Sequence, residues 1–310
     1  ILLVEALAMT AMEGYIVYYH TLIFAHCDLS LRTLGLSQAD LVYHGIFIMS
    51  FVYQLFLYMD SIRQRNVFQL IMLLLYGILL VIYTGVQTIQ HQMFVKVGCD
   101  FPPLLLHMSV VISNNTDRFQ DSIDDYISNI KPFEYAILVF VPICFLIMVG
   151  CMIKLYSLFR WSRYKTHTLV LDNGTRLHTT LLAWAILTGL LKLDFFFVFS
   201  FAVQLVPSQL MEYTIPSYES PVVFCFGLAA FLLAIQSTRT ENIRLMWLFS
   251  LAVLGSIGYF GYRLFTFGIP RLGTNDPYML TRYSLLFTTL TLTLLMIMTL
   301  CTCLVCIKNV

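Results

Sequence analysis

Eight apolar runs divide this chain of 310 residues and constrain its fold more than any other feature. A helix needs about 20 mostly apolar residues to cross a hydrocarbon core of roughly 30 Å. The runs lie at 1–25, 43–59, 67–88, 133–153, 181–205, 222–236, 245–262 and 283–307. We therefore predict an all-α fold, a polytopic transmembrane helix bundle of about eight spans that forms a single domain over residues 1–310.

The composition excludes the main soluble classes. Charged side chains make up 11% of the chain and hydrophobic ones 59%, whereas a soluble protein carries about 25% charged residues. The mean hydropathy is +0.81 and the formal net charge is +1. Such a chain has too little polar surface for an ordinary soluble domain, and it lacks the basic field that nucleic-acid binding requires.

Two of the runs, 43–59 and 222–236, are short. A stretch shorter than the hydrocarbon core must thin the bilayer, and early secretory membranes are thinner than the plasma membrane. The first run begins at Ile1 without an initiator Met, so we expect further residues upstream. Because that run is long and contains Glu5 and Glu13, we expect a true span and not a cleaved signal peptide.

The distribution of Lys and Arg predicts the orientation, since positive charge is retained on the cytosolic side. Ten such residues lie in one set of connecting segments, 60–66, 154–180, 237–244 and 308–310. Only seven lie in the opposite set, which is about twice as long: 26–42, 89–132, 206–221 and 263–282. We therefore place the first set and both termini in the cytosol, and 89–132 becomes a lumenal loop.

Lumenal segments carry two kinds of modification signal. Asn114 opens an Asn-Asn-Thr glycosylation sequon, whereas the Asn-Gly-Thr sequon at Asn173 falls in the cytosol, where it would be inert. Cys27 and Cys99 both lie in predicted lumenal segments, where an oxidising compartment permits a disulfide. Two free or buried thiols remain the alternative.

Three ionisable residues fall deep inside the predicted spans: Glu13, Lys192 and Asp194. Lys192 and Asp194 lie about 16–20 Å in from the start of their run, near the bilayer midplane. A charge at that depth costs about 2.5–3.5 kcal/mol on insertion scales and normally faces the bundle interior. Because two residues on a helix are about 200° apart, Lys192 and Asp194 should turn to different neighbours.

Glu13 and Lys192 form the natural interhelical pair at this depth. Asp194 is then protonated, or it bonds to hydroxyl groups or to Gln54. One interpretation is a structural ion pair that sets helix registration. The other is a proton- or ion-coupled transport site.

Cysteines and basic residues gather at the predicted cytosolic surface. Cys301, Cys303 and Cys306 could be palmitoylated there or could serve as small apolar filler. The stretch 154–165 interleaves basic and aromatic residues, which suits anionic headgroups and equally suits ordinary topology anchoring.

Three histidines, His20, His26 and His44, lie near the lumenal membrane surface. Their spacing matches no standard ligand pattern, so we predict no metal site. The chain also lacks the HExxH, GxSxG, P-loop and GxGxxG motifs. We accordingly expect neither a cofactor nor an enzyme.

Several strings, taken in chain order, resemble an uncharacterised family of fungal multi-pass membrane proteins assigned to the Golgi apparatus. The strings are Glu13-Gly14-Tyr15, Tyr58-Met59-Asp60 with Arg63, Arg65, Asn66 and Gln69, Trp161 with Tyr164-Lys165, Leu191 to Phe197, Arg239 with Glu241-Asn242, and Arg282 with Cys306 to Asn309. The resemblance implies an all-helical membrane fold and an endomembrane address, but the family has no established activity to carry over. Segment 89–132 is longer than the resemblance leads us to expect.

Two functions follow as expectations. The first is a non-catalytic accessory or trafficking component of a membrane complex, whose partners are the bilayer, other membrane subunits and anionic lipids at the cytosolic face, with no nucleic acid. The alternative is a proton- or ion-coupled small-solute transporter that uses Glu13, Lys192 and Asp194. A seven-helix receptor is opposed by the number of runs and by the cytosolic N-terminus.

Overall fold

The computed structural model describes residues 1–25, 31–98, 126–167, 174–208, 218–240, 242–269, 278 and 281–309. No strand occurs within these ranges, and the predicted all-α bundle is confirmed. The long helices are α1 (Leu2–Ala25), α2 (Leu31–Gln64), α3 (Val67–Gly98), α5 (Lys131–His167), α6 (Gly174–Gln204), α7 (Glu219–Thr240), α8 (Ile243–Gly268) and α9 (Arg282–Asn309). A π-helical turn (Tyr126–Ile130) precedes α5, and a 3-10 turn (Val206–Ser208) follows α6.

Seven of these helices, α2, α3 and α5 to α9, are long and apolar enough to cross a membrane. This is the pattern of a multi-pass membrane protein. Helix α1, which carries Glu5 and Glu13, is not one of the seven. Both glutamates are nevertheless buried, and α1 packs alongside α2 and α5.

The two runs predicted to be short belong to longer helices. The membrane-crossing stretches are Gln38–Gln64 in α2 and Glu219–Thr240 in α7, of 27 and 22 residues. Even 22 residues span roughly 33 Å, which is enough to cross a bilayer. The expectation of short spans is therefore wrong, because polar residues such as Asp40 are buried inside the bundle and do not end the helix.

The predicted connecting segments are also more helical than expected. Both ends of segment 89–132 are helical, since α3 continues to Gly98 and the turn before α5 begins at Tyr126. Segment 154–180 is helical as far as His167 and again from Gly174. Polar residues end a hydrophobic run without ending the hydrogen-bonded helix, so the apolar runs underestimate helix length.

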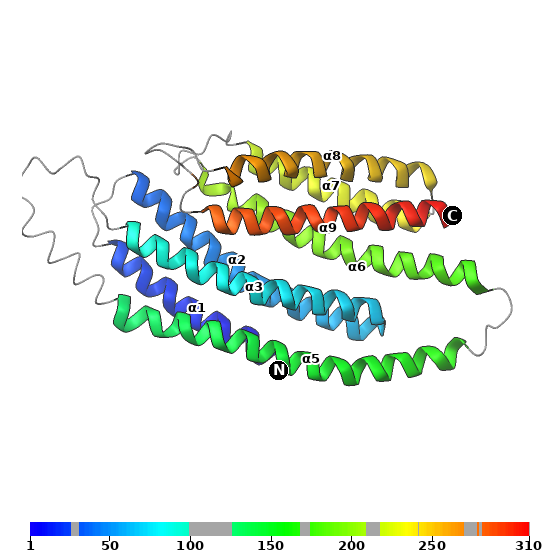
Figure 1. The fold of residues 1–310 in the computed structure, drawn as a ribbon, viewed down its shortest axis with the longest axis horizontal. Coiled ribbons are helices and arrows are strands. Elements are labelled where there is room, and N and C mark those ends of the chain that lie inside the picture. The colour runs from blue at the N-terminus through cyan, green and yellow to red at the C-terminus, as the bar shows by residue number, and fades with distance from the viewer. Residues whose placement is uncertain are drawn as a thin grey trace, which may run out of the picture.

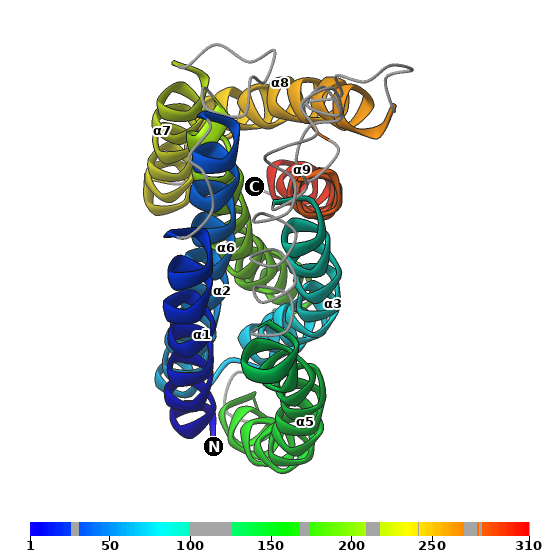
Figure 2. The ribbon, with the colours of Figure 1, turned by 90° about the vertical axis from the view of Figure 1, so that its left-hand side faces the viewer.

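The helices form two groups of four (Figure 1). Helices α1, α2, α3 and α5 pack together as the N-terminal group, and α6, α7, α8 and α9 form the C-terminal group. Viewed along the helices, the bundle is elongated, with α8 at one end, α1 and α5 at the other, and α6 between them (Figure 2). Helix α6 joins the groups because it contacts α2 and α3 as well as α7 and α9.

Close packing holds the two groups together. Tyr53 of α2 stacks on Phe196 of α6 with ring centroids 4.8 Å apart. Gly189 of α6 lies so close to α3 that a Cβ atom there would be 2.7 Å from Met72 Cγ. Only a residue without a side chain allows this approach, as is common where membrane helices pack tightly.

Candidate metal centre and other buried polar sites

The buried acid of the first helix has a partner that the sequence analysis did not foresee. Glu13 contacts the Nδ1 atom of His44 on α2. Lys192 lies elsewhere and pairs with Asp60. The predicted Glu13–Lys192 pair is therefore wrong, because matching charges by depth overlooked both the imidazole of His44 and Asp60 near the C-terminal end of α2.

Five ionisable side chains converge around this contact from four helices. They are Glu13 of α1, Asp40 and His44 of α2, His91 of α3 and Glu134 of α5, each at most 5% exposed. Asp40 and His44 lie four residues apart and share one helix face. We call these five residues the histidine–carboxylate cluster.

Three atoms of the cluster form a nearly equilateral triangle. His44 Nε2 lies 3.3 Å from His91 Nδ1 and 3.3 Å from Asp40 Oδ2, and His91 Nδ1 lies 3.1 Å from Asp40 Oδ2. A tetrahedral zinc ion with bonds of about 2.0 Å separates its ligand atoms by about 3.3 Å. The triangle therefore has the dimensions of one face of a tetrahedral zinc site, and these three residues could hold a metal ion.

The outer nitrogen of each imidazole faces a carboxylate. Glu13 contacts His44 Nδ1, and Glu134 Oε1 lies 3.3 Å from His91 Nε2. A carboxylate beside the Nδ1 atom of His44 favours a proton on that atom, which leaves a lone pair on Nε2. Carboxylates orient metal-binding histidines in the same way. His91 Nδ1 lies within hydrogen-bond distance of both Asp40 carboxylate oxygens, so a metal ion would take the place of a proton there. The arrangement thus brings two imidazole nitrogens and one carboxylate oxygen together around a common point.

Little space lies beside the two histidines of the cluster, and Asp40 does not border it. A cavity of about 10 Å³ borders Glu13, His44, Gln87, His91 and Glu134. That volume is close to what one water molecule needs. The space beside the two histidines is therefore too small for an organic substrate.

The prediction that the chain has no metal site rested on His20, His26 and His44, and of these only the side chain of His44 is described. His44 pairs instead with His91, 47 residues later in the chain. His26 and the side chain of His20 lie outside the described residues. The overlooked signal was a spacing of four in two helices, Asp40 with His44 and Gln87 with His91.

The backbone carbonyl and the side-chain ammonium group of Lys192 lie at different depths. Its carbonyl oxygen accepts a 2.6 Å hydrogen bond from the Tyr53 hydroxyl, near the middle of α2. Its ammonium group donates to Asp60, near the end of α2, and to Gln69 Oε1 at 3.3 Å. A long side chain can carry its charge toward the membrane surface in this way. The lysine head is thus nearer the predicted cytosolic face than its backbone is.

Asp194 faces the other side of α6. Thr299 Oγ1 of α9 donates a 2.5 Å hydrogen bond to Asp194 Oδ2. This confirms that Lys192 and Asp194 turn to different neighbours, and it selects the hydroxyl partner that the sequence left open. Gln54 instead donates to Met148 Sδ at 3.4 Å.

Glu13, Lys192 and Asp194 consequently lie at three separate places, each with a different partner. They do not assemble into the single transport site that the alternative function required. Side chains at the same depth can contact each other only when their helices are neighbours and their polar faces are turned toward one another.

The cysteines of α9 differ in exposure. Cys301 is exposed, whereas Cys303 and Cys306 are fully buried. Palmitoylation of Cys303 and Cys306 is therefore contradicted, because an acyl chain could not be attached inside the packed helices, and Cys301 alone keeps that prediction.

The modification signals predicted for the lumenal segments, Asn114, Cys27 and Cys99, lie outside the described residues. The same is true of Asn173, and nothing in the structure bears on these four positions. Their assignment stays a prediction from the sequence.

Comparison with known protein families, with curated proteins and with solved structures finds no match for this chain. The resemblance to a fungal Golgi family therefore rests only on the short sequence strings given in the sequence analysis. The function is therefore argued from the geometry of the buried sites.

Proposed function

We propose that this chain is a multi-pass protein of the Golgi or a related endomembrane that binds one divalent transition-metal ion, with zinc as the first candidate. The carrying observation is the triangle of His44 Nε2, His91 Nδ1 and Asp40 Oδ2 with edges of 3.1–3.3 Å. Two histidines and one carboxylate, with a further coordination position left over, form a recurrent ligand set for zinc and for iron.

The surroundings of the triangle support a bound cation. Glu13 and Glu134 bring two further carboxylates to the outer nitrogens of the histidines. Ionised carboxylates in a buried site need compensating positive charge, and a divalent ion supplies two charges at once. Because the adjoining cavity holds about one water molecule, we assign the site to ion binding and not to catalysis on an organic substrate.

The metal content of the purified chain tests this proposal. Protein extracted from zinc-replete cells should carry close to one zinc ion per chain by elemental mass spectrometry. Asp40→Asn and His91→Ala should lose most of that metal because each removes a ligand. Asp60→Asn is the matched control, since Asp60 lies on the same helix but pairs with Lys192.

Two results would overturn the proposal. One is wild-type protein without bound metal after purification and zinc reconstitution. The other is equal metal content in Asp40→Asn and Asp60→Asn. In either case the cluster would be a structural network of histidines and carboxylates.

The proposed orientation counts α1 as a further span beside the seven, and it places both termini in the cytosol and the histidine–carboxylate cluster near the lumen. It is supported by the excess of Lys and Arg in the segments on the other side, and the address by the family resemblance. A glycan on Asn114 that Asn114→Gln removes and Asn173→Gln does not would test the orientation, and co-localisation with a Golgi marker would test the address. A glycan on Asn173 would reverse the topology.

An accessory or trafficking role in a membrane complex is the second candidate function. Its supporting observation is the high exposure of α7, since only 11% of its most apolar membrane-crossing window is buried. A neighbouring subunit could pack on the exposed surface of α7. Anionic lipids could contact the basic residues at the proposed cytosolic ends of the helices. A stoichiometric partner that copurifies from native membranes would support this role, and a strictly solitary protein under gentle extraction would count against it.

A further inference from the structure

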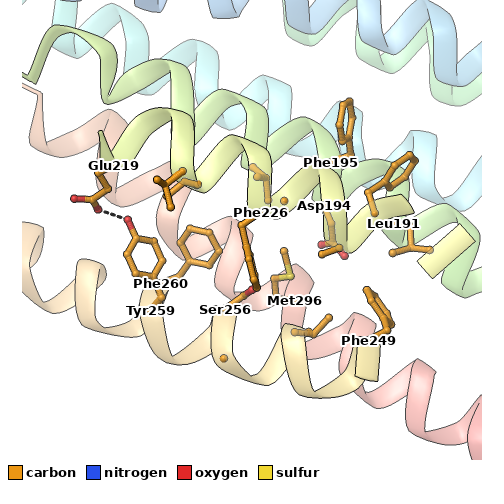
Figure 3. A pocket seen from close by; sticks show the side chains of 18 residues that line it. Leu191, Asp194, Phe195, Glu219, Phe226, Phe249, Ser256, Tyr259, Phe260 and Met296 are labelled. Atoms are coloured by element: carbon orange, nitrogen blue, oxygen red, sulfur yellow. Dashed lines mark hydrogen bonds between the residues drawn. The ribbon is translucent and has the colours of Figure 1, made fainter. Parts of the chain in front are cut away.

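A second cavity lies between α6, α7, α8 and α9, on helices that do not contribute to the histidine–carboxylate cluster (Figure 3). Its volume is about 310 Å³, and most of its lining residues are apolar. Small-molecule pockets begin at about this size, from roughly 300 Å³ upward. The cavity can therefore hold an apolar body much larger than a water molecule.

The cavity opens on the outside of the bundle, between two membrane-crossing helices. Val222 and Phe226 of α7 line it and are 57% and 53% exposed. Both α7 and α8 are long and apolar enough to cross the bilayer. A ligand that enters between them comes from the hydrocarbon region, so it must be a membrane component.

Two buried acids, Asp194 and Glu219, border this apolar space, and only Asp194 has an oxygen atom without a donor among the described residues. Asp194 lines the cavity and is 4% exposed, and its Oδ2 atom accepts the hydrogen bond from Thr299. Its Oδ1 atom accepts no hydrogen bond from any residue that the structure describes. Figure 3 shows this carboxyl group among Leu191, Phe195 and Met296. A buried acceptor without a donor is destabilising, and a donor from a ligand would satisfy it.

The charges at the far end of the cavity satisfy one another. Glu219 of α7 accepts hydrogen bonds from the Tyr259 hydroxyl and from the Arg263 guanidinium of α8. This end therefore does not call for a charged headgroup. An ammonium ligand fits Asp194 poorly, because it brings three donors to a place where one acceptor atom is open.

We infer that this cavity binds the apolar body of a neutral membrane lipid with one hydroxyl group, of the sterol or diacylglycerol class, and that the hydroxyl donates a hydrogen bond to Asp194 Oδ1. The inference is independent of the metal centre. It uses different helices, and either site can exist without the other.

Photolabelling of the full chain in lipid nanodiscs tests the inference. Two photoactivatable, clickable probes are used, one sterol and one diacylglycerol, each competed by its unlabelled parent lipid. Saturable labelling by either probe is expected and identifies the source of the hydroxyl. The labelled peptides should map to the faces of α7 and α8 around Val223 and Ser256, which line the cavity.

Paired leucine substitutions on α8 provide the control. A Cβ atom at Gly255 or at Gly258 would meet nothing within 4 Å, so both positions accept a side chain. Only Gly255 lines the cavity. Gly255→Leu should abolish saturable labelling because its side chain fills the space, whereas Gly258→Leu should label as the wild type does.

A third variant isolates the carboxyl group. Asp194→Leu should weaken labelling roughly tenfold, the equivalent of one buried hydrogen bond. The inference is overturned if neither probe labels saturably, if the labelled peptides lie outside the cavity, or if Gly255→Leu and Gly258→Leu label alike. Because peptide mapping uses the wild-type chain, the outcome does not depend on the folding of any variant.

Discussion

At the scale of single residues, every buried charge that the sequence singled out takes its partner from a different helix. Glu13 faces His44, Lys192 faces Asp60, and Asp194 faces Thr299. The partner decides the chemistry in each case. A carboxylate behind an imidazole prepares a metal ligand. The carboxylate of Asp60 neutralises the ammonium group of Lys192. Within the part of the chain that the structure describes, Asp194 accepts a hydrogen bond on one oxygen only, so its other oxygen is open to a donor.

Glu134→Gln should weaken metal binding without abolishing it. The substitution leaves Asp40, His44 and His91 in place but removes the negative charge that faces His91 Nε2. Loss of such an orienting carboxylate typically lowers metal affinity about 10–100-fold. Competition with a chelating dye would measure the change. Glu5→Gln, which alters another buried acid outside the cluster, should leave the affinity unchanged, and equal affinities for the two variants would contradict the assigned role.

Lys192→Met should destabilise the bundle. It leaves Asp60 without its cation, at a site where the two side chains are 15% and 19% exposed. Because the pair lies between the fully buried and the surface cases, the expected cost is about 1–3 kcal/mol. Thermal unfolding in detergent would show it. Adding Asp60→Leu should recover part of the loss, whereas additive effects of the two changes would mean that the residues are not coupled.

At the scale of single helices, α2 positions two polar sites. Asp40 and His44 lie near one end and Asp60 near the other, and 20 residues of helix separate the acids by about 30 Å. The straight run of α2 thus links the metal-binding candidate on the predicted lumenal side to the ion pair on the cytosolic side. Helix α6 completes the second site and carries Asp194 on its opposite face.

Gly189→Ala should destabilise the contact between α3 and α6. A methyl group at this position would lie 2.7 Å from Met72 Cγ, close to the backbone of α3. Overpacking of this kind costs about 1–3 kcal/mol. Gly258→Ala is the matched control, because its methyl group meets nothing within 4 Å and alanine favours the helix. The two variants should shift the unfolding temperature in opposite directions, and a similar shift for both would contradict the packing argument.

At the scale of the whole molecule, the bundle consists of two groups of four helices with separate sites. The N-terminal group contains the histidine–carboxylate cluster, whose residues come from α1, α2, α3 and α5. The C-terminal group contains the apolar cavity. A bound metal ion would link residues of the cluster from all four N-terminal helices. Its removal should therefore lower the stability of the entire N-terminal group.

Chelation should lower the unfolding temperature of the wild-type chain. A ligand at 100 times its dissociation constant stabilises the folded state by about 2.7 kcal/mol, which for a protein of this size corresponds to several degrees. Differential scanning fluorimetry with and without a strong chelator would measure the shift. His91→Ala, which lacks one ligand, should show no chelator effect. A shift of equal size in that variant would place the chelated metal elsewhere.

The neighbours of the buried polar residues could be predicted only in part. The opposed directions of Lys192 and Asp194 followed from helix geometry alone, and the structure confirms them. The partner of Glu13 did not follow, because depth along a helix restricts which residues are level with each other but not which helices are adjacent. His91 was missed for the same reason, since its companion lies 47 residues away.

The sequence by itself determined the all-helical membrane architecture, because runs of apolar residues as long as a bilayer is thick leave the backbone no other way to satisfy its hydrogen bonds. The tertiary structure alone decided which polar groups meet. That outcome depends on which helices pack side by side and how each is rotated about its axis. Two histidines and three carboxylates became one cluster only when four helices turned their polar faces inward.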